Sequence, residues 1–141
     1  MRVLFIDDQP EIRCEHARRF YEGCEFIHMM ELPKSFKGYD VISFDNDLGH
    51  QDVADEMNRR FWSQDGDSEI VQGQDLIDQI KDKVLVVHSM NPVASVRLQN
   101  LFLGIGIWTT YRIQFNNMLD PNDSFLNILE SIKTLKDFQC R

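Results

Sequence analysis

Carboxylate side chains gather in this sequence directly after short apolar segments. One pair follows the segment RVLFI, and a second pair, with one residue between its members, follows VISF. Carboxylates held within a few ångströms of one another repel unless a proton or a cation lies between them. Mg²⁺ prefers oxygen ligands and in proteins takes one or two carboxylates, often together with a substrate phosphate. We therefore predict a site for a divalent cation, Mg²⁺ or Mn²⁺, formed by four residues: Asp7, Asp8, Asp45 and Asp47.

A histidine and a hydroxyl group follow a third apolar segment, VLVV. His88 and Ser89 are followed by Asn91-Pro92, and proline suits the first turn of a helix. An imidazole, a hydroxyl and backbone N–H groups would thus meet at one helix N-terminus, which is a favourable position for phosphate. We predict that His88 is a general acid and that Ser89 and Asn91 bind a phosphate group. The alternative interpretation, a hydrogen-bonded structural histidine, stays open.

The loop after VISF contains two further groups that can transfer protons. Asp47 is one, and His50 follows it three residues later. We predict both as acid–base residues, and His50 could instead be a metal ligand or an exposed loop residue. Asp8 and Asp47 could also simply cap the helices that follow them, each contributing about 1 kcal/mol.

The apolar segments that carry these residues alternate with helical patterns. Such alternation predicts an α/β fold, a doubly wound parallel sheet. With five strands we expect the flavodoxin-like order 2-1-3-4-5, in which strands 1, 3 and 4 are adjacent and their carboxyl ends meet. Strands are predicted at 2–6, 24–28, 41–45, 83–88 and 104–110, and helices at 11–21, 54–62, 73–80, 91–103 and 123–138, with a short or broken helix within 29–39. Asp123 or Ser124 is the predicted N-cap of the last helix.

Length and charge restrict the class of protein. A chain of 141 residues suits one domain, 1–141, with an inserted loop or helix at about 50–72. The net charge of −8 argues against broad nucleic-acid binding but not against a small phosphate ligand. The three cysteines, the absence of a long apolar run and a start without signal-peptide features predict a cytoplasmic protein that binds no membrane.

The acidic residues resemble those of response-regulator receiver domains. In that family an acidic pair after the first strand binds Mg²⁺, and an aspartate ending the third strand accepts a phosphoryl group. Asp7, Asp8 and Asp45 match those positions. The sequence departs from the family at His88-Ser89 and at the fifth strand, where Thr109-Thr110 replace the usual lysine.

A narrower resemblance explains those departures better, and it extends over essentially the whole chain apart from the insertion at about 50–72. FDNDLGH at 44–50 and HSMNPV at 88–93 are similar to the D-H-D-L-G-type and H-S-x-N-P-type motifs of receiver-like domains described as cyclic-phosphate-processing. Asn46 stands where that family has a histidine, and His50 could replace it. The resemblance implies processing of cyclic or terminal phosphates on nucleotides or RNA ends.

Two hypotheses about function follow. The first is a metal-dependent phosphoesterase acting on a cyclic or terminal phosphate of a nucleotide or RNA. The second is a non-enzymatic, atypical receiver-like module that signals by binding a protein partner or a ligand. The small size and acidic surface would also suit a phage or mobile-element accessory protein, although no residue demonstrates it.

Overall fold

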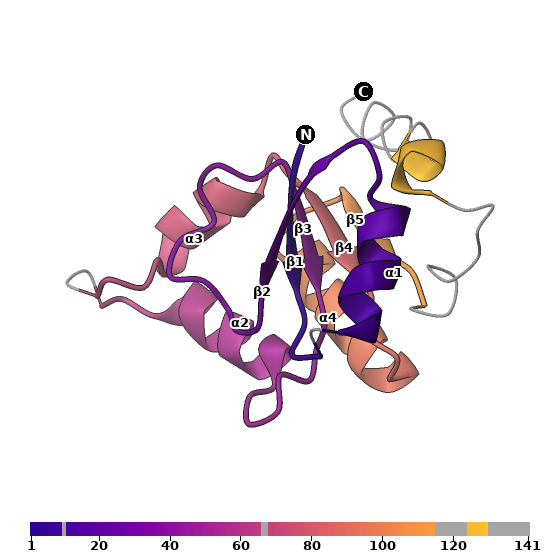
Figure 1. Ribbon diagram of the computed structural model, residues 1–141. Coiled ribbons are helices and arrows are strands. Elements are labelled where there is room, and N and C mark those ends of the chain that lie inside the picture. The colour runs from indigo at the N-terminus through magenta and orange to yellow at the C-terminus, as the bar shows by residue number, and fades with distance from the viewer. Residues whose placement is uncertain (10, 66–67, 115–123, 130–141) are drawn as a thin grey trace.

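The fold is a five-stranded parallel sheet with helices on both faces (Figure 1). The computed structural model describes residues 1–9, 11–65, 68–114 and 124–129. The strand order β2-β1-β3-β4-β5 confirms the predicted α/β class and the predicted order. Along the chain the elements are β1 (Arg2–Ile6), α1 (Ile12–Phe20), β2 (Glu25–Met29), β3 (Val41–Phe44), α2 (Val53–Trp62), α3 (Gly73–Ile80), β4 (Val84–Val87), α4 (Pro92–Gly104) and β5 (Thr110–Arg112).

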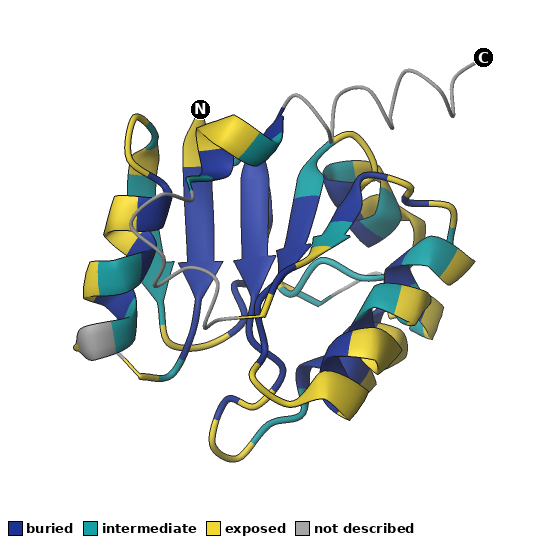
Figure 2. Cartoon of the chain, turned by 90° about the vertical axis from the view of Figure 1, so that its right-hand side faces the viewer, coloured by how far each residue is buried: buried dark blue, intermediate teal, exposed yellow. Residues whose placement is uncertain are grey.

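The central strands divide the hydrophobic core into two layers. Successive side chains of a strand point to opposite faces of the sheet. Leu4 and Ile42 therefore belong to the layer under α2, α3 and α4, whereas Val3 and Val41 belong to the layer under α1 and the helical residues 125–129. Figure 2 shows these strands buried along their length, with their arrows directed toward one edge of the sheet. Polar residues that follow the strands consequently emerge together at that edge.

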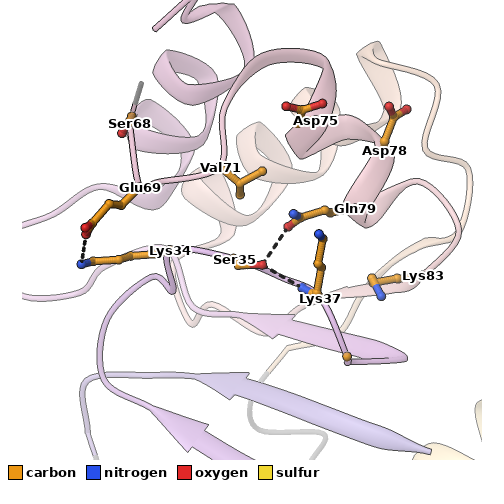
Figure 3. Close-up of a pocket in the computed structure, with 11 residues that line it drawn as sticks. Lys34, Ser35, Lys37, Ser68, Glu69, Val71, Asp75, Asp78, Gln79 and Lys83 are labelled. Atoms are coloured by element: carbon orange, nitrogen blue, oxygen red, sulfur yellow. Dashed lines mark hydrogen bonds and ion pairs between the residues drawn. The ribbon is translucent and has the colours of Figure 1, made fainter. Parts of the chain in front are cut away.

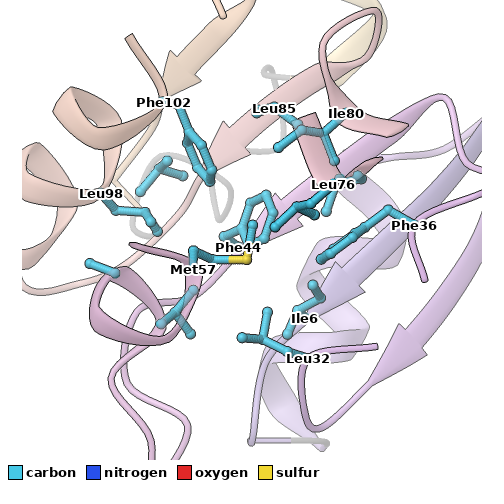
Figure 4. Close-up of a cluster of buried hydrophobic side chains, with 14 of the residues drawn as sticks. Ile6, Leu32, Phe36, Phe44, Met57, Leu76, Ile80, Leu85, Leu98 and Phe102 are labelled. Carbon is cyan, nitrogen blue, oxygen red and sulfur yellow. The ribbon is translucent and has the colours of Figure 1, made fainter. Parts of the chain in front are cut away.

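The layer under α2, α3 and α4 holds the loop after β3 in place. Figure 4 shows Phe44, the last residue of β3, between Met57 of α2 and Phe102 of α4. The rings of Phe44 and Phe102 lie 5.1 Å apart between centroids, and all three side chains are fully buried. This packing fixes the end of β3, and with it the start of the acidic loop, against two helices.

Two predictions from the sequence were wrong: the short helix within 29–39 and the bounds of the fifth strand. No helix forms within 29–39, because this segment is held by contacts with distant elements. The Arg60 guanidinium donates to the carbonyl of Pro33 at 2.9 Å, and the Phe36 amide donates to Gln79 at 2.8 Å. The fifth strand lies at Thr110–Arg112 rather than 104–110, because α4 continues to Gly104 and the chain then turns at Gly106 with φ +88°.

The predicted C-terminal helix is described only in part. Residues 125–129 are helical, and the Ser124 hydroxyl oxygen accepts a hydrogen bond from the Asn127 amide at 3.3 Å, as an N-cap does. The alternative cap, Asp123, and the rest of 123–138 lie outside the described residues. Across the described part of the chain, no helix combines the length and apolar character needed to cross a membrane.

Candidate metal and phosphate site

Three of the four predicted metal ligands meet at the carboxyl edge of the sheet. β1 and β3 are neighbours, and Ile6 pairs with Phe44 in register, so the residues that follow each strand emerge side by side. Asp7, Asp8 and Asp45 each place a carboxylate oxygen within 4.8 Å of the other two. Asp7 and Asp45 are buried, with exposed fractions of 0% and 3%, whereas Asp8 is half-buried.

The donor set fits a hard divalent cation. Two oxygens bound to one Mg²⁺ at about 2.1 Å lie at most about 4.2 Å apart, and for Ca²⁺ at about 2.4 Å this limit is about 4.8 Å. Oxygens within 4.8 Å of one another can therefore surround Ca²⁺ as they stand, and Mg²⁺ after a small contraction. Asp47 was also predicted as a ligand but lies outside this group. It is exposed and pairs with Asp52 in a short antiparallel bridge.

Arg13 provides the positive charge between two of these carboxylates. Its Nη1 lies 3.2 Å from Asp7 Oδ2 and 3.5 Å from Asp45 Oδ2. Nη2 of the same guanidinium donates to the sulfur of Met90 at 2.9 Å, across the end of β4. From the sequence, Arg13 could reach an anionic ligand, but surface arginines are common and we assigned it no role in the site. The only signal was its place in the first turn of the helix that follows the acidic pair.

The two buried carboxylates differ in proton affinity. Burial, together with the negative charges of Asp7 and Asp8, raises the pKa of Asp45 to about 7, although Arg13 opposes this shift. Burial also acts to raise the pKa of Asp7. There it is outweighed by hydrogen bonds from His88 and the Gln9 amide and by the charge of Arg13, so the pKa of Asp7 falls below its usual value. Asp7 is therefore the ionised member of the pair. Near neutral pH, Asp45 is present in both its protonated and its ionised form.

A depression of about 290 Å³ opens above the acidic residues. It contains residues from the loops after β1, β3 and β4, so it lies where the three strand ends meet. Gly49 has φ +69°, and a side chain there would both be strained and contact Asp8. The lining residues are Asp8, Gln9, Arg13, Asp45, Asp47, Gly49, Ser89, Met90 and Asn91.

The predicted phosphate-binding residues lie at this depression, but the amides of the helix are already in use. Ser89 and Asn91 both line it. The Asn91 side-chain oxygen caps α4 by accepting from the amides of Val93 and Ala94 at 3.1 and 3.2 Å. The sequence had suggested that backbone N–H groups at this helix N-terminus would bind phosphate. These two N–H groups are instead bonded to Asn91 and are not available to a ligand. The Ser89 hydroxyl and the guanidinium of Arg13, which also contacts Asp7 and Asp45, are further donors that line the depression.

The two histidines predicted as acid–base residues lie away from the depression. His88 is fully buried, and its ring nitrogens lie 2.7 Å from Ser43 Oγ and 3.2 Å from Asp7 Oδ2. Burial lowers the pKa of His88, and its contact with Asp7 opposes this only in part. His50 is exposed and is not among the lining residues. Asp47 is the one predicted acid–base residue that lines the depression.

Asn46 organises the acidic loop instead of serving as a ligand. It is fully buried, and its side-chain oxygen accepts from the Ala54 amide at 3.1 Å. Its amide nitrogen donates to the carboxylates of Asp47 at 3.3 Å and Asp52 at 3.2 Å. Asp52 in turn caps α2 through the Asp55 amide. A neutral amide at this position therefore joins the loop to the first turn of α2.

A larger cavity, of about 750 Å³, lies at the opposite edge of the sheet (Figure 3). One wall comes from the segment before β3 and carries Lys34 and Lys37, and the other comes from α3 and carries Asp75 and Asp78. None of the residues predicted from the sequence as catalytic, phosphate-binding or metal-binding lines it.

Comparison with known proteins gives one fold relative. No protein-family model and no curated protein matches the chain. A solved structure does match, described as the crystal structure of a response regulator protein from Burkholderia pseudomallei with a phosphorylated aspartic acid, calcium ion and citrate. The identity is 14%, the TM-score is 0.52, and the match covers 96% of this chain and 74% of that chain. At this identity the likeness shows the fold alone, which is receiver-like.

Proposed function

We propose that the depression binds a divalent cation together with a phosphoryl group, and that the protein is a metal-dependent phosphoesterase. Its substrate would be a cyclic or terminal phosphate of a nucleotide or of an RNA end. The observation that carries the proposal is the group of three carboxylate oxygens within 4.8 Å of one another beside a depression that also contains Arg13 and Ser89. Cation ligands and phosphate donors thus lie around one small space.

The carboxylates and the arginine have separate tasks in this proposal. Asp7, Asp8 and Asp45 hold Mg²⁺ or Mn²⁺, an ion that polarises phosphoryl oxygens and lowers the pKa of a bound water. Arg13 contacts two of these carboxylates in the metal-free protein. Because the ion takes over that neutralising charge, Arg13 becomes available to a phosphoryl group, which a planar guanidinium binds through two parallel hydrogen bonds.

Proton transfer is assigned to Asp47 in place of His88. The exposed carboxylate of Asp47 lines the depression, so it can reach a substrate, whereas the His88 ring is fully buried. A positioned acid–base group is worth about 10²–10⁴ in rate. The chain's net charge of −8 favours a small phosphate-bearing group over a long nucleic acid as the ligand.

A non-enzymatic receiver-like module is the second candidate. Thr109 and Thr110, expected where receivers have their lysine, instead lie at the amino end of β5, away from the acidic site, and their hydroxyls donate to the backbone carbonyls of Lys83 and Ile107. The structural relative is described with a phosphorylated aspartate and a calcium ion. By analogy, Asp45 of this chain would accept the phosphoryl group in the second candidate, with Arg13 as the nearby cation.

One set of assays separates the two candidates. Wild-type protein is incubated with 2′,3′-cyclic nucleotides and phosphorylated RNA ends, with Mg²⁺ or Mn²⁺, and the products are quantified. We expect turnover in the wild type, none in Asp45→Asn, and a loss of about 10²–10⁴-fold in Asp47→Asn with cation binding retained. Asp75→Asn, in the opposite cavity, is the matched control and should keep wild-type turnover.

The contrary outcome is equally clear. Wild-type protein that binds the cation but turns over no member of the panel would contradict the phosphoesterase proposal. Labelling of Asp45 by acetyl phosphate, detected by mass spectrometry and absent in Asp45→Asn, would then support the receiver-like module.

A further inference from the structure

A continuous line of buried polar groups runs from α1 to the acidic site. The Tyr21 hydroxyl donates to Ser43 Oγ at 2.8 Å, Ser43 Oγ lies 2.7 Å from His88 Nδ1, and His88 Nε2 lies 3.2 Å from Asp7 Oδ2. All four side chains belong to residues with an exposed fraction of 0%. They come from the end of α1, from β3, and from the first positions after β4 and β1.

The direction of these hydrogen bonds follows from the donors that each group has. A serine hydroxyl carries one hydrogen. Ser43 accepts from Tyr21, and the ionised carboxylate of Asp7 can only accept, so in a neutral His88 ring Nδ1 is left to accept the hydrogen of Ser43. The ring proton then resides on Nε2 and is donated to the carboxylate of Asp7. The line thus selects one histidine tautomer and aims its N–H at a single oxygen.

Aromatic packing fixes the plane of the histidine ring. Phe5 of β1 stacks on His88 with ring centroids 4.4 Å apart and an interplanar angle of 15°. Phe5 also contacts the edge of the Tyr21 ring, at 6.5 Å between centroids, so one phenyl group packs against both aromatic rings of the line. The ring of His88 therefore has little freedom to turn its Nε2 away from Asp7.

A buried line of polar side chains lowers the stability of the fold unless each of its polar groups has a hydrogen-bond partner. The residues around it on this face of the sheet are apolar, including Val3, Val41 and Val86. Three apolar side chains in place of Tyr21, Ser43 and His88 would continue that layer without any desolvation of polar groups. The contact that distinguishes the line from ordinary core is its last one, to Asp7.

We propose that Tyr21, Ser43 and His88 are positioning residues of the cation site, which hold the Asp7 carboxylate in its ligand orientation through the Nε2–H of His88. This inference rests on the proposed cation binding at Asp7, Asp8 and Asp45. Outer residues that orient a ligand of a metal typically change its affinity 10–100-fold when they are removed.

The test combines cation affinity with the state of the histidine ring. We expect Ser43→Ala to weaken Mg²⁺ binding about tenfold by calorimetry, and Tyr21→Phe to weaken it less, because Ser43 can still donate. Tyr39→Phe, which removes a hydroxyl from a half-buried tyrosine outside the line, should bind as wild type does. In ¹⁵N spectra, His88 of the wild type should show a fixed Nε2–H tautomer that Ser43→Ala perturbs, with its signals assigned by their loss in His88→Gln.

Each other result contradicts the proposal in a recognisable way. Folded Ser43→Ala with wild-type affinity, or a wild-type His88 protonated at Nδ1, would overturn it. Should Ser43→Ala not fold, unchanged affinity and an unchanged ring spectrum in Tyr21→Phe would do the same. Wild-type protein that binds neither Mg²⁺ nor Mn²⁺ would overturn the proposed function and the positioning role with it, and a fixed Nε2–H signal would then show the hydrogen-bond line itself to be intact.

Discussion

The two edges of the sheet carry charge in opposite ways. At the carboxyl edge, a depression of about 290 Å³ lies above Asp7 and Asp45, which are almost fully buried. At the amino edge, a cavity of about 750 Å³ has lysines on one wall and acids on the other (Figure 3). There the ion pair of Lys34 and Glu69 spans 2.9 Å, and both of its side chains are well exposed.

The difference shows that the volume of a cavity does not identify the functional site of this protein. Exposed charges of opposite sign are solvated and contribute little to stability. Buried carboxylates of like sign repel, and they are stabilised when a cation binds between them. Within the described ranges of the chain, only Asp7, Asp8 and Asp45 form such a group. The smaller depression is therefore the one whose charged groups would be stabilised by a bound cation.

Asp45→Asn should give the largest change in stability. Burial and Asp7 raise the pKa of Asp45 from 3.8 to about 7, so keeping it ionised at pH 8 costs the fold up to about 4 kcal/mol, at 1.36 kcal/mol per pKa unit. The neutral amide removes this cost, and the metal-free variant should be more stable by a few kcal/mol in urea unfolding with chelator present. Asp75→Asn is the control and should match wild type. An Asp45→Asn variant that is less stable than wild type would show that the ionised carboxylate of Asp45 does not destabilise the wild-type fold.

The stability of the metal-free wild type should fall as the pH rises from about 4 to about 7. In this window Asp45 holds its proton in the folded state and loses it in the unfolded state, so the unfolded chain binds fewer protons and the free energy of unfolding decreases. Asp7 acts oppositely, because its lowered pKa adds stability that is lost only as the pH falls below about 4. Urea unfolding at half-unit pH intervals measures the slope, and Asp45→Asn should abolish most of it.

Arg13→Gln should have a smaller effect, and one that depends on the ligand. Its hydrogen bonds to Asp7 and Asp45 are of the charged kind, each worth about 1.5–3 kcal/mol, so the metal-free protein should be destabilised by about that amount. Mg²⁺ alone should bind more tightly, because no guanidinium competes with it. Inorganic phosphate added with Mg²⁺ should bind more weakly. Calorimetry that finds both affinities unchanged would remove Arg13 from the site.

Lys37→Ala, in the larger cavity, should change almost nothing. Lys37 is exposed, and surface substitutions of this kind usually stay within about 0.5 kcal/mol. Thermal unfolding with and without Mg²⁺ should therefore give wild-type values. A loss of the Mg²⁺ response in this variant would show that the two edges are coupled, and it would end the contrast drawn between them.

Local patterns in the sequence were sufficient for most of the elements. The run GQDLIDQI predicted α3 at its observed bounds, and RVLFI predicted β1, because apolar periodicity and helix-start residues act over a few neighbouring positions. The segment 29–39 was misjudged because its conformation depends on Arg60 and Gln79, which are distant in the sequence. No local pattern contains those contacts.

The sequence by itself determined that acidic residues would end two adjacent parallel strands, and Asp7, Asp8 and Asp45 do meet there. Only the tertiary structure decided that Arg13 lies between two of them and that His88 is buried beneath Asp7. The physical reason is that a strand end fixes where a residue emerges, through backbone pairing that is readable from the pattern. Which side chains then face solvent, and which turn inward to share a proton or a charge, depends on how α1 and the sheet pack together.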